Sequence, residues 1–125
     1  MLMATEIQTL AKCKTFEDFR LLIDDSADDK DNTALAVLAF SGALNLASSL
    51  EESMNLLWTS ESLNYKLQKR AFENTMGFIT DSDSRNEFEA RFRPGWLGWL
   101  FSHRELVIMV CDKYHNLQVQ QQAPA

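Results

Sequence analysis

Cysteine and histidine are scarce in this chain, and their spacing allows one test for a metal site. Cys111 and His115 lie four residues apart, and His103 lies upstream. On a helix, this i, i+4 pair would share one face, as two zinc ligands can. His103 would project about a quarter turn away, and a fourth ligand would have to be the distant Cys13. We therefore expect a buried cysteine beside a solvated histidine, with no metal and no cofactor.

An acidic run offers carboxylates in a pattern that calcium could use. A calcium-binding loop beginning at Asp29 would have Ala34 where glycine is required and Phe40 where the bidentate glutamate is required. A loop beginning at Asp81 fails at the same two positions. We therefore predict a solvated acidic loop that a basic partner could bind. Its aspartates are Asp24, Asp25, Asp28, Asp29 and Asp31.

Sequence signatures of catalysis are mostly missing. The chain has no glycine-rich phosphate-binding loop, no G-x-S-x-G elbow, no H-E-x-x-H pair and no C-x-x-C pair. The dipeptide Arg85-Asn86 resembles the start of the motif of HEPN-type helical domains, which include ribonuclease toxins and place a histidine shortly after the arginine. No histidine lies that close after Arg85 in this chain, so the general acid–base role of the motif is vacant. We predict a non-catalytic protein, and the resemblance implies one alternative, a degenerate ribonuclease using Arg85, Asn86 and His103.

The segment from Trp96 to Phe101 reads WLGWLF and holds two of the three tryptophans. It is either a plug that fills the core or a hydrophobic docking site, because tryptophan and arginine are enriched at binding hot spots. A homodimer interface is one form of the second interpretation. The candidate partner-binding residues, together with the acidic run, are Trp96, Trp99, Phe101, Arg91, Arg93 and Arg104.

The arginines of the second half raise a second alternative, a module that stacks single-stranded nucleic acid on its aromatic side chains. The formal net charge of −6 disfavours phosphate-backbone binding. The arginines can instead pair with nearby Glu87, Glu89 and Asp112. We therefore expect nucleic acid not to be the partner.

Helical spacing of apolar residues dominates the chain and predicts an all-α fold. We expect a single domain over residues 1–117, a compact bundle of five to seven helices, followed by a disordered polar tail over 118–125. A hydrophobic helix over about 33–57 would be central, with an alanine ridge at Ala39, Ala43 and Ala47 that lets another helix approach closely. Its apolar stripe is Leu35, Leu38, Gly42, Leu46, Leu50, Met54 and Leu57.

Flanking helices are expected over about 5–12, 15–25, 60–79, 84–92 and 102–117, with a short helical turn after Pro94. Thr15 with Asp18, and Ser102 with Glu105, are predicted capping boxes. Residues 106–111 are rich in β-branched side chains, so the pattern leaves helix or strand open there.

Composition and the N-terminus limit the class of protein. At 125 residues, 46% of them apolar and 24% charged, the chain is typical of one soluble globular domain. Residues 33–50 carry no charge, but their serines and the following glutamates favour a buried helix over a membrane span. The N-terminus does not resemble an export signal, so we expect a cytoplasmic location and reduced cysteines. The prediction is an acidic protein that binds another protein as an inhibitor or adaptor, including one encoded by a phage or mobile element.

Overall fold

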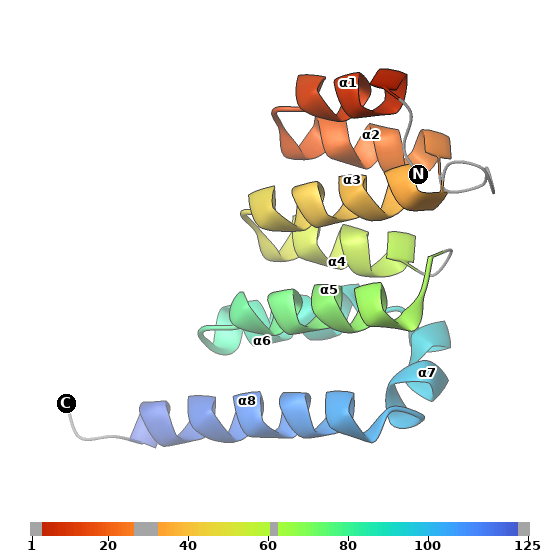
Figure 1. Ribbon diagram of the computed structural model, residues 1–125. Coiled ribbons are helices and arrows are strands. Elements are labelled where there is room, and N and C mark those ends of the chain that lie inside the picture. Colours follow the sequence, from red (N-terminus) through yellow and green to blue (C-terminus); the bar gives the residue numbers. More distant parts are fainter. Residues whose placement is uncertain (1–3, 27–32, 61–62, 123–125) are drawn as a thin grey trace.

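The computed structural model describes residues 4–26, 33–60 and 63–122, and all regular structure in these ranges is helical (Figure 1). This confirms the all-α fold, although the described ranges contain eight α-helices where five to seven were predicted. In chain order the elements are α1 (Ala4–Lys12), α2 (Phe16–Ser26), α3 (Thr33–Leu46), α4 (Leu50–Thr59), α5 (Tyr65–Gly77), α6 (Ser82–Arg91), the 3-10 turn η3 (Pro94–Trp96), α7 (Leu97–Phe101) and α8 (Arg104–Gln122).

The helices stack in two layers (Figure 1). In the first layer α1, α3, α5 and α8 follow one another, and each contacts the next. In the second layer α2, α4 and α6 lie behind them, with α4 in contact with α6. Because α3 contacts α1, α2, α4 and α5, it is the central hydrophobic helix that the sequence predicts.

The most extensive helix–helix contact joins α2 to α3. Of the predicted ridge of small residues, Ala39 and Ala43 are completely buried, whereas Ala47 lies beyond the end of α3 and is only partly buried. At Gly42, a Cβ atom would stand 2.5 Å from the Phe19 ring, so a larger residue there would force that ring to move. The missing side chain at Gly42 therefore lets the Phe19 ring of α2 pack directly against α3.

The predicted helix over 33–57 is wrong in one respect: it is two helices, α3 and α4. Ser49 has extended backbone angles (φ −145°, ψ 161°), and its Oγ accepts a hydrogen bond from the Glu52 N–H at 3.2 Å. The Glu52 carboxylate in turn accepts from the Ser48 N–H at 2.8 Å. Ser49-x-x-Glu52 is itself a capping-box signature, which the continuous apolar stripe concealed. Two members of the predicted apolar stripe, Leu38 and Leu46, lie on the surface, at 45% and 42% exposure.

Other helix starts follow local capping. The Thr15 box is confirmed, because Thr15 Oγ1 accepts from the Asp18 N–H and the Asp18 carboxylate accepts from the Thr15 N–H. Helix α5 begins at Tyr65 rather than near residue 60, because the Asn64 side chain accepts from the Leu67 N–H. An Asp81–Ser84 capping box starts α6.

The predicted Ser102–Glu105 box does not form. The Ser102 hydroxyl donates to the Gly98 carbonyl at 2.6 Å and so closes α7 instead of opening α8. Glu105 accepts a hydrogen bond from the Tyr65 hydroxyl. Helix α8 includes residues 106–111, which settles them as helical, and it continues through Gln122. Residues 118–122 are therefore helical where a disordered tail was expected, and residues 123–125 lie outside the described ranges.

Candidate functional site

Trp96 and Trp99 face the core side of α7, where they join an aromatic cluster. Trp96 lies edge-on between Trp58 and Trp99, with ring centroids 4.9 and 4.8 Å away. Trp99 also packs against Phe72 at 6.0 Å, and its Nε1 donates to Gln68 Oε1 at 3.3 Å. Both indoles are half-buried. Their principal neighbours are therefore other side chains of this protein, as the core interpretation expects.

Phe101 and Leu97 lie on the opposite side of α7 and face solvent. Phe101 is 69% exposed and Leu97 is 43% exposed, whereas Leu100 between them is buried. The WLGWLF segment therefore does two things at once: its tryptophans anchor α7 to the core, and its phenylalanine and first leucine form an open apolar surface. The sequence posed a core plug and a docking site as alternatives. The structure places the tryptophans against the core and leaves Leu97 and Phe101 exposed on the other face, where docking stays a prediction.

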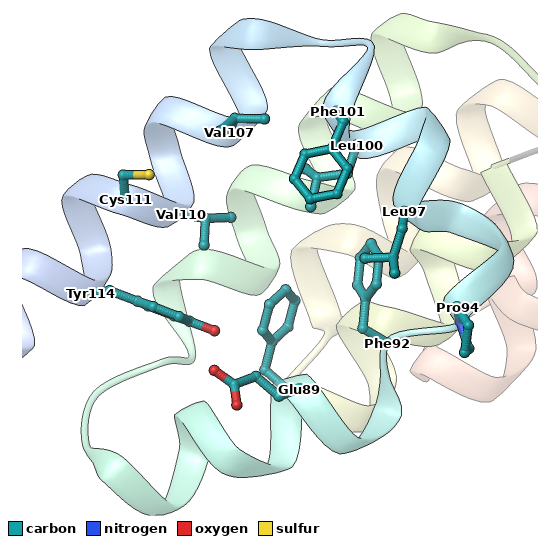
Figure 2. Close-up of a pocket in the computed structure, with 11 residues that line it drawn as sticks. Glu89, Phe92, Pro94, Leu97, Leu100, Phe101, Val107, Val110, Cys111 and Tyr114 are labelled. Atoms are coloured by element: carbon teal, nitrogen blue, oxygen red, sulfur yellow. The ribbon is translucent and has the colours of Figure 1, made fainter.

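That open surface continues into a groove between α6 and α8, with α7 closing one end (Figure 2). The groove has a volume of about 560 Å³, within the range of about 300–1,000 Å³ typical of ligand sites. Its floor comes from Phe88 of α6 and from Phe92, which caps the end of that helix, and Leu97, Leu100 and Phe101 line the end formed by α7.

Helix α8 contributes the longest wall of the groove. Val107, Val110, Cys111 and Tyr114 line it at spacings of i, i+3, i+4 and i+7, the pattern of a single helix face. Leu106 and Leu117 are buried and belong to the core, whereas none of these four groove residues is fully buried. Helix α8 thus carries an apolar stripe that is only partly covered by the other helices of the described chain.

A polar group marks the far end of the groove. The Tyr114 hydroxyl points toward the Glu89 carboxylate (Figure 2), and burial together with this hydrogen bond raises the pKa of Tyr114 to about 12. The Arg85 guanidinium lies over the Tyr114 ring, 4.9 Å from its centroid, and its Nε is 3.6 Å from a Glu89 oxygen. Glu89 is half-exposed and is the charged side chain that lines the groove.

Most arginines of the candidate set are already engaged within the protein. Arg91 forms ion pairs with Glu87 at 3.0 Å and with Glu51 at 3.7 Å. Arg93 lies over the Trp58 ring at 5.0 Å, and Arg104 is exposed at the first residue of α8. The expected pairing of arginines with Glu87 and Glu89 is confirmed. Such pairing reduces the positive charge that nucleic-acid phosphates would need.

The two acidic candidates that the structure describes, Asp24 and Asp25, lie on α2, at the other end of the helix stack from the groove. Asp24 of α2 forms an ion pair with Arg20 at 3.2 Å, and Asp25 is exposed. Asp28, Asp29 and Asp31 lie outside the described residues. Helix α2 is in the upper part of the stack and α8 is at the bottom (Figure 1), so the two candidate surfaces do not form a single site.

The residues of the ribonuclease alternative are held in two separate clusters. Arg85 packs on Tyr114 and pairs with Glu89. The His103 ring instead stacks on Tyr65 at 4.4 Å, and its Nδ1 is 2.7 Å from the Trp99 carbonyl oxygen. Asn86 is exposed on α6. These contacts give His103 no hydrogen bond to the Arg85-Asn86 pair.

The cysteine and histidine candidates are dispersed. Cys111 is exposed in the groove wall, which corrects the expectation that it is buried, and His115 is exposed as expected. Both cysteines are free thiols. Over the described ranges, no three His, Cys, Asp or Glu side chains are grouped to hold a metal ion.

Sequence reasoning missed most of the groove. Phe88, Leu97, Val107, Val110 and Tyr114 line it but were not among the predicted site residues. The signal was available in α8, where residues 107, 110, 111 and 114 repeat at helical spacing. It was concealed because the same residues belong to a β-branched run that also suits a strand.

No protein-family model matches the sequence, and neither a curated protein nor a solved structure matches it significantly. Among the helices of the described ranges, none is both long enough and apolar enough to span a membrane.

Proposed function

We propose that this protein is a non-catalytic binding module, an inhibitor or adaptor that holds a segment of another protein in the α6–α7–α8 groove. The observation that carries the proposal is the groove itself, about 560 Å³ and lined by apolar side chains from three helices. Phe101, the most exposed large apolar side chain of the described residues, stands at its edge. An open apolar surface of this kind is costly in water, and it is typical of a binding site.

The arrangement of the groove also resembles known hot-spot architecture. Aromatic anchors near a pocket supply most of the binding energy in protein interfaces, while surrounding residues exclude water. Here Phe101 and Tyr114 border an apolar floor made by Phe88 and Phe92, and Glu89 adds one charge. Because α7 is fixed by its tryptophans, Phe101 and Leu97 are held in place before a partner arrives. This preorganisation lowers the entropic cost of binding.

The proposal is tested by selecting peptides from a random displayed library against three proteins. Leu97→Glu places a carboxylate in the groove, whereas Leu38→Glu makes the same change at an almost equally exposed leucine outside it. We expect peptides that bind the native chain and Leu38→Glu, and that lose at least about tenfold in affinity for Leu97→Glu because a charge replaces an apolar contact. If every selected peptide binds all three proteins equally, the groove is not the binding site and the proposal is wrong.

A further inference from the structure

The groove lies where the second layer of the stack has no full helix. Along the first layer α8 follows α5, and along the second layer α6 follows α4 (Figure 1). Behind α8, which is 19 residues long, the described part of the chain places only the five-residue α7 after α6. The open face of α8 from Val107 to Tyr114 spans about two turns, or ~10 Å at 1.5 Å per residue. A helix inserted there would lie between α6 and α8. It would continue the second layer, in which α4 and α6 already lie behind the first layer.

The side chains of the groove repeat at the spacings that receive a helix. Helix α8 presents an i, i+3, i+4, i+7 stripe, and α7 presents Leu97, Leu100 and Phe101 at i, i+3 and i+4. Phe88 of α6 and its C-cap residue Phe92 are also spaced i, i+4. Rows of this kind accept the ridges of another helix. A peptide that binds by adding a strand would instead need an open sheet edge, and every regular element in the described ranges is helical.

The charge of the groove favours a basic occupant. Glu89 contributes a half-exposed carboxylate to the wall, and it is the charged side chain of the lining. Arg85 offsets part of the Glu89 charge, so the local preference is modest. The preference comes from this carboxylate alone, because the net acidic charge of the chain lies mainly in residues 1–61.

From this geometry we infer that the partner segment is an amphipathic, basic helix, which lays its apolar stripe between α6 and α8 and places a lysine or arginine beside Glu89. The inference rests on the proposed function, since it names the kind of segment that the groove would bind. It adds two properties that the proposal does not contain: the helical stripe and the positive charge. Each property can fail while the groove remains a binding site.

Three labelled synthetic peptides separate these properties. The first has leucines at i, i+3, i+4 and i+7 with lysines on the other face, the second replaces the lysines by glutamates, and the third permutes the first so that the stripe is lost. Dissociation constants are measured by fluorescence anisotropy. We expect the lysine peptide to bind at least about tenfold more tightly than the permuted peptide, because only the helix buries its whole apolar face. We expect the lysine peptide to bind about two- to fivefold more tightly than the glutamate peptide, because exposed charge pairs contribute little to affinity.

A matched pair of variants assigns the charge preference. Glu89→Gln removes the groove carboxylate, and Glu87→Gln removes a carboxylate two residues away that pairs with Arg91 instead. Both change the net charge equally. We expect Glu89→Gln to reduce the preference for lysine over glutamate, and Glu87→Gln to leave most of it.

Several outcomes would overturn the inference. It is wrong if the permuted peptide binds as well as the lysine peptide, if the glutamate peptide binds equally or better, or if the two glutamine variants behave alike. It is also wrong if none of the three peptides binds while library peptides still lose affinity for Leu97→Glu; the groove would then bind a different kind of segment. If no peptide of either kind depends on Leu97, the proposed function itself fails.

Discussion

The α2–α3 contact and the α6–α8 groove are two apolar regions with opposite outcomes. Where α2 meets α3, Gly42 lets the Phe19 ring lie directly against the backbone, and α3 also carries Phe40, which is completely buried in the core. Between α6 and α8 the apolar residues are larger, α7 supplies only five residues, and a groove of about 560 Å³ stays open. Both regions are apolar, so composition does not distinguish a closed core from an open groove. Side-chain size and the length of the neighbouring helix distinguish them.

The largest expected difference is between a core phenylalanine of α3 and a phenylalanine of the groove. Phe40→Ala should lower the free energy of unfolding by about 3–5 kcal/mol, because it leaves a cavity in a closed core. Phe101→Ala should change it by less than about 0.5 kcal/mol, because that ring is 69% exposed. Urea unfolding followed by circular dichroism measures both values. A loss at Phe101 as large as that at Phe40 would mean that the groove is part of the closed core.

The glycines sharpen the same comparison. Gly42→Ala should destabilise the fold by about 1–3 kcal/mol, because the new methyl group would meet the Phe19 ring. Gly98→Ala in α7 should stabilise it by about 0.5–1 kcal/mol, because no atom lies within 4 Å of the added Cβ and alanine favours a helix. Thermal unfolding compares the two variants. Equal shifts of the midpoint in one direction would argue against the close approach of α2 to α3.

A smaller effect tests which serine begins a helix. Ser49→Ala should cost about 1 kcal/mol, because Ser49 Oγ caps the first turn of α4. Ser102→Ala should cost less than about 0.5 kcal/mol, because the exposed Ser102 hydroxyl only donates to the Gly98 carbonyl at the end of α7. The free energy of unfolding in urea gives both costs. If Ser102→Ala cost more than Ser49→Ala, the result would support the predicted long helix over 33–57 and the predicted cap at Ser102.

The smallest signal is spectroscopic. The chain has two tyrosines, and burial with a hydrogen bond to Glu105 raises the pKa of Tyr65 to about 12, as burial and Glu89 do for Tyr114. Absorbance at alkaline pH should therefore show both phenols ionising well above 10 in the folded protein, and near 10 in urea. Since the folded protein holds these protons more tightly, their contribution to stability is complete below pH 10 and is lost as the pH rises toward 12.

Glu89→Gln provides the control for that titration. It should lower the pKa of Tyr114, because the carboxylate that opposes ionisation is gone, and leave Tyr65 unchanged. A titration in which one phenol ionises near pH 10 in the native chain would contradict the polar contact at the end of the groove.

The sequence was sufficient to predict the helical class, the central position of α3 and the burial of Ala39 and Ala43 on its ridge, because helical periodicity and residue size are local properties. It did not reveal the break after Leu46, because the apolar stripe runs through it and the Ser49 cap competes on a scale of about 1 kcal/mol. Tertiary contacts also decided the role of Glu105, which accepts from Tyr65 instead of capping α8. Such long-range partners cannot be predicted from local sequence patterns.

The candidate site was only partly predictable for a related reason. Phe101 was named from its segment, but its tryptophan neighbours lie against the core. Whether a helix face is covered depends on elements far away in the chain. The Val107–Tyr114 stripe stays open because α7 ends at Phe101. The residues of the stripe themselves do not indicate where α7 ends.

The two free thiols provide the most direct measurement of the central claim, that the groove between α6 and α8 binds a helix. Cys111 lies in the groove wall, and Cys13 lies beyond the end of α1, where its thiol donates to the Thr9 carbonyl. Iodoacetamide labelling of each thiol is followed by mass spectrometry, with and without the lysine-bearing amphipathic peptide. We predict that the peptide slows labelling of Cys111 in proportion to the fraction of grooves that it occupies. The labelling rate of Cys13 should stay unchanged. Unchanged labelling of Cys111 at saturating peptide would contradict it.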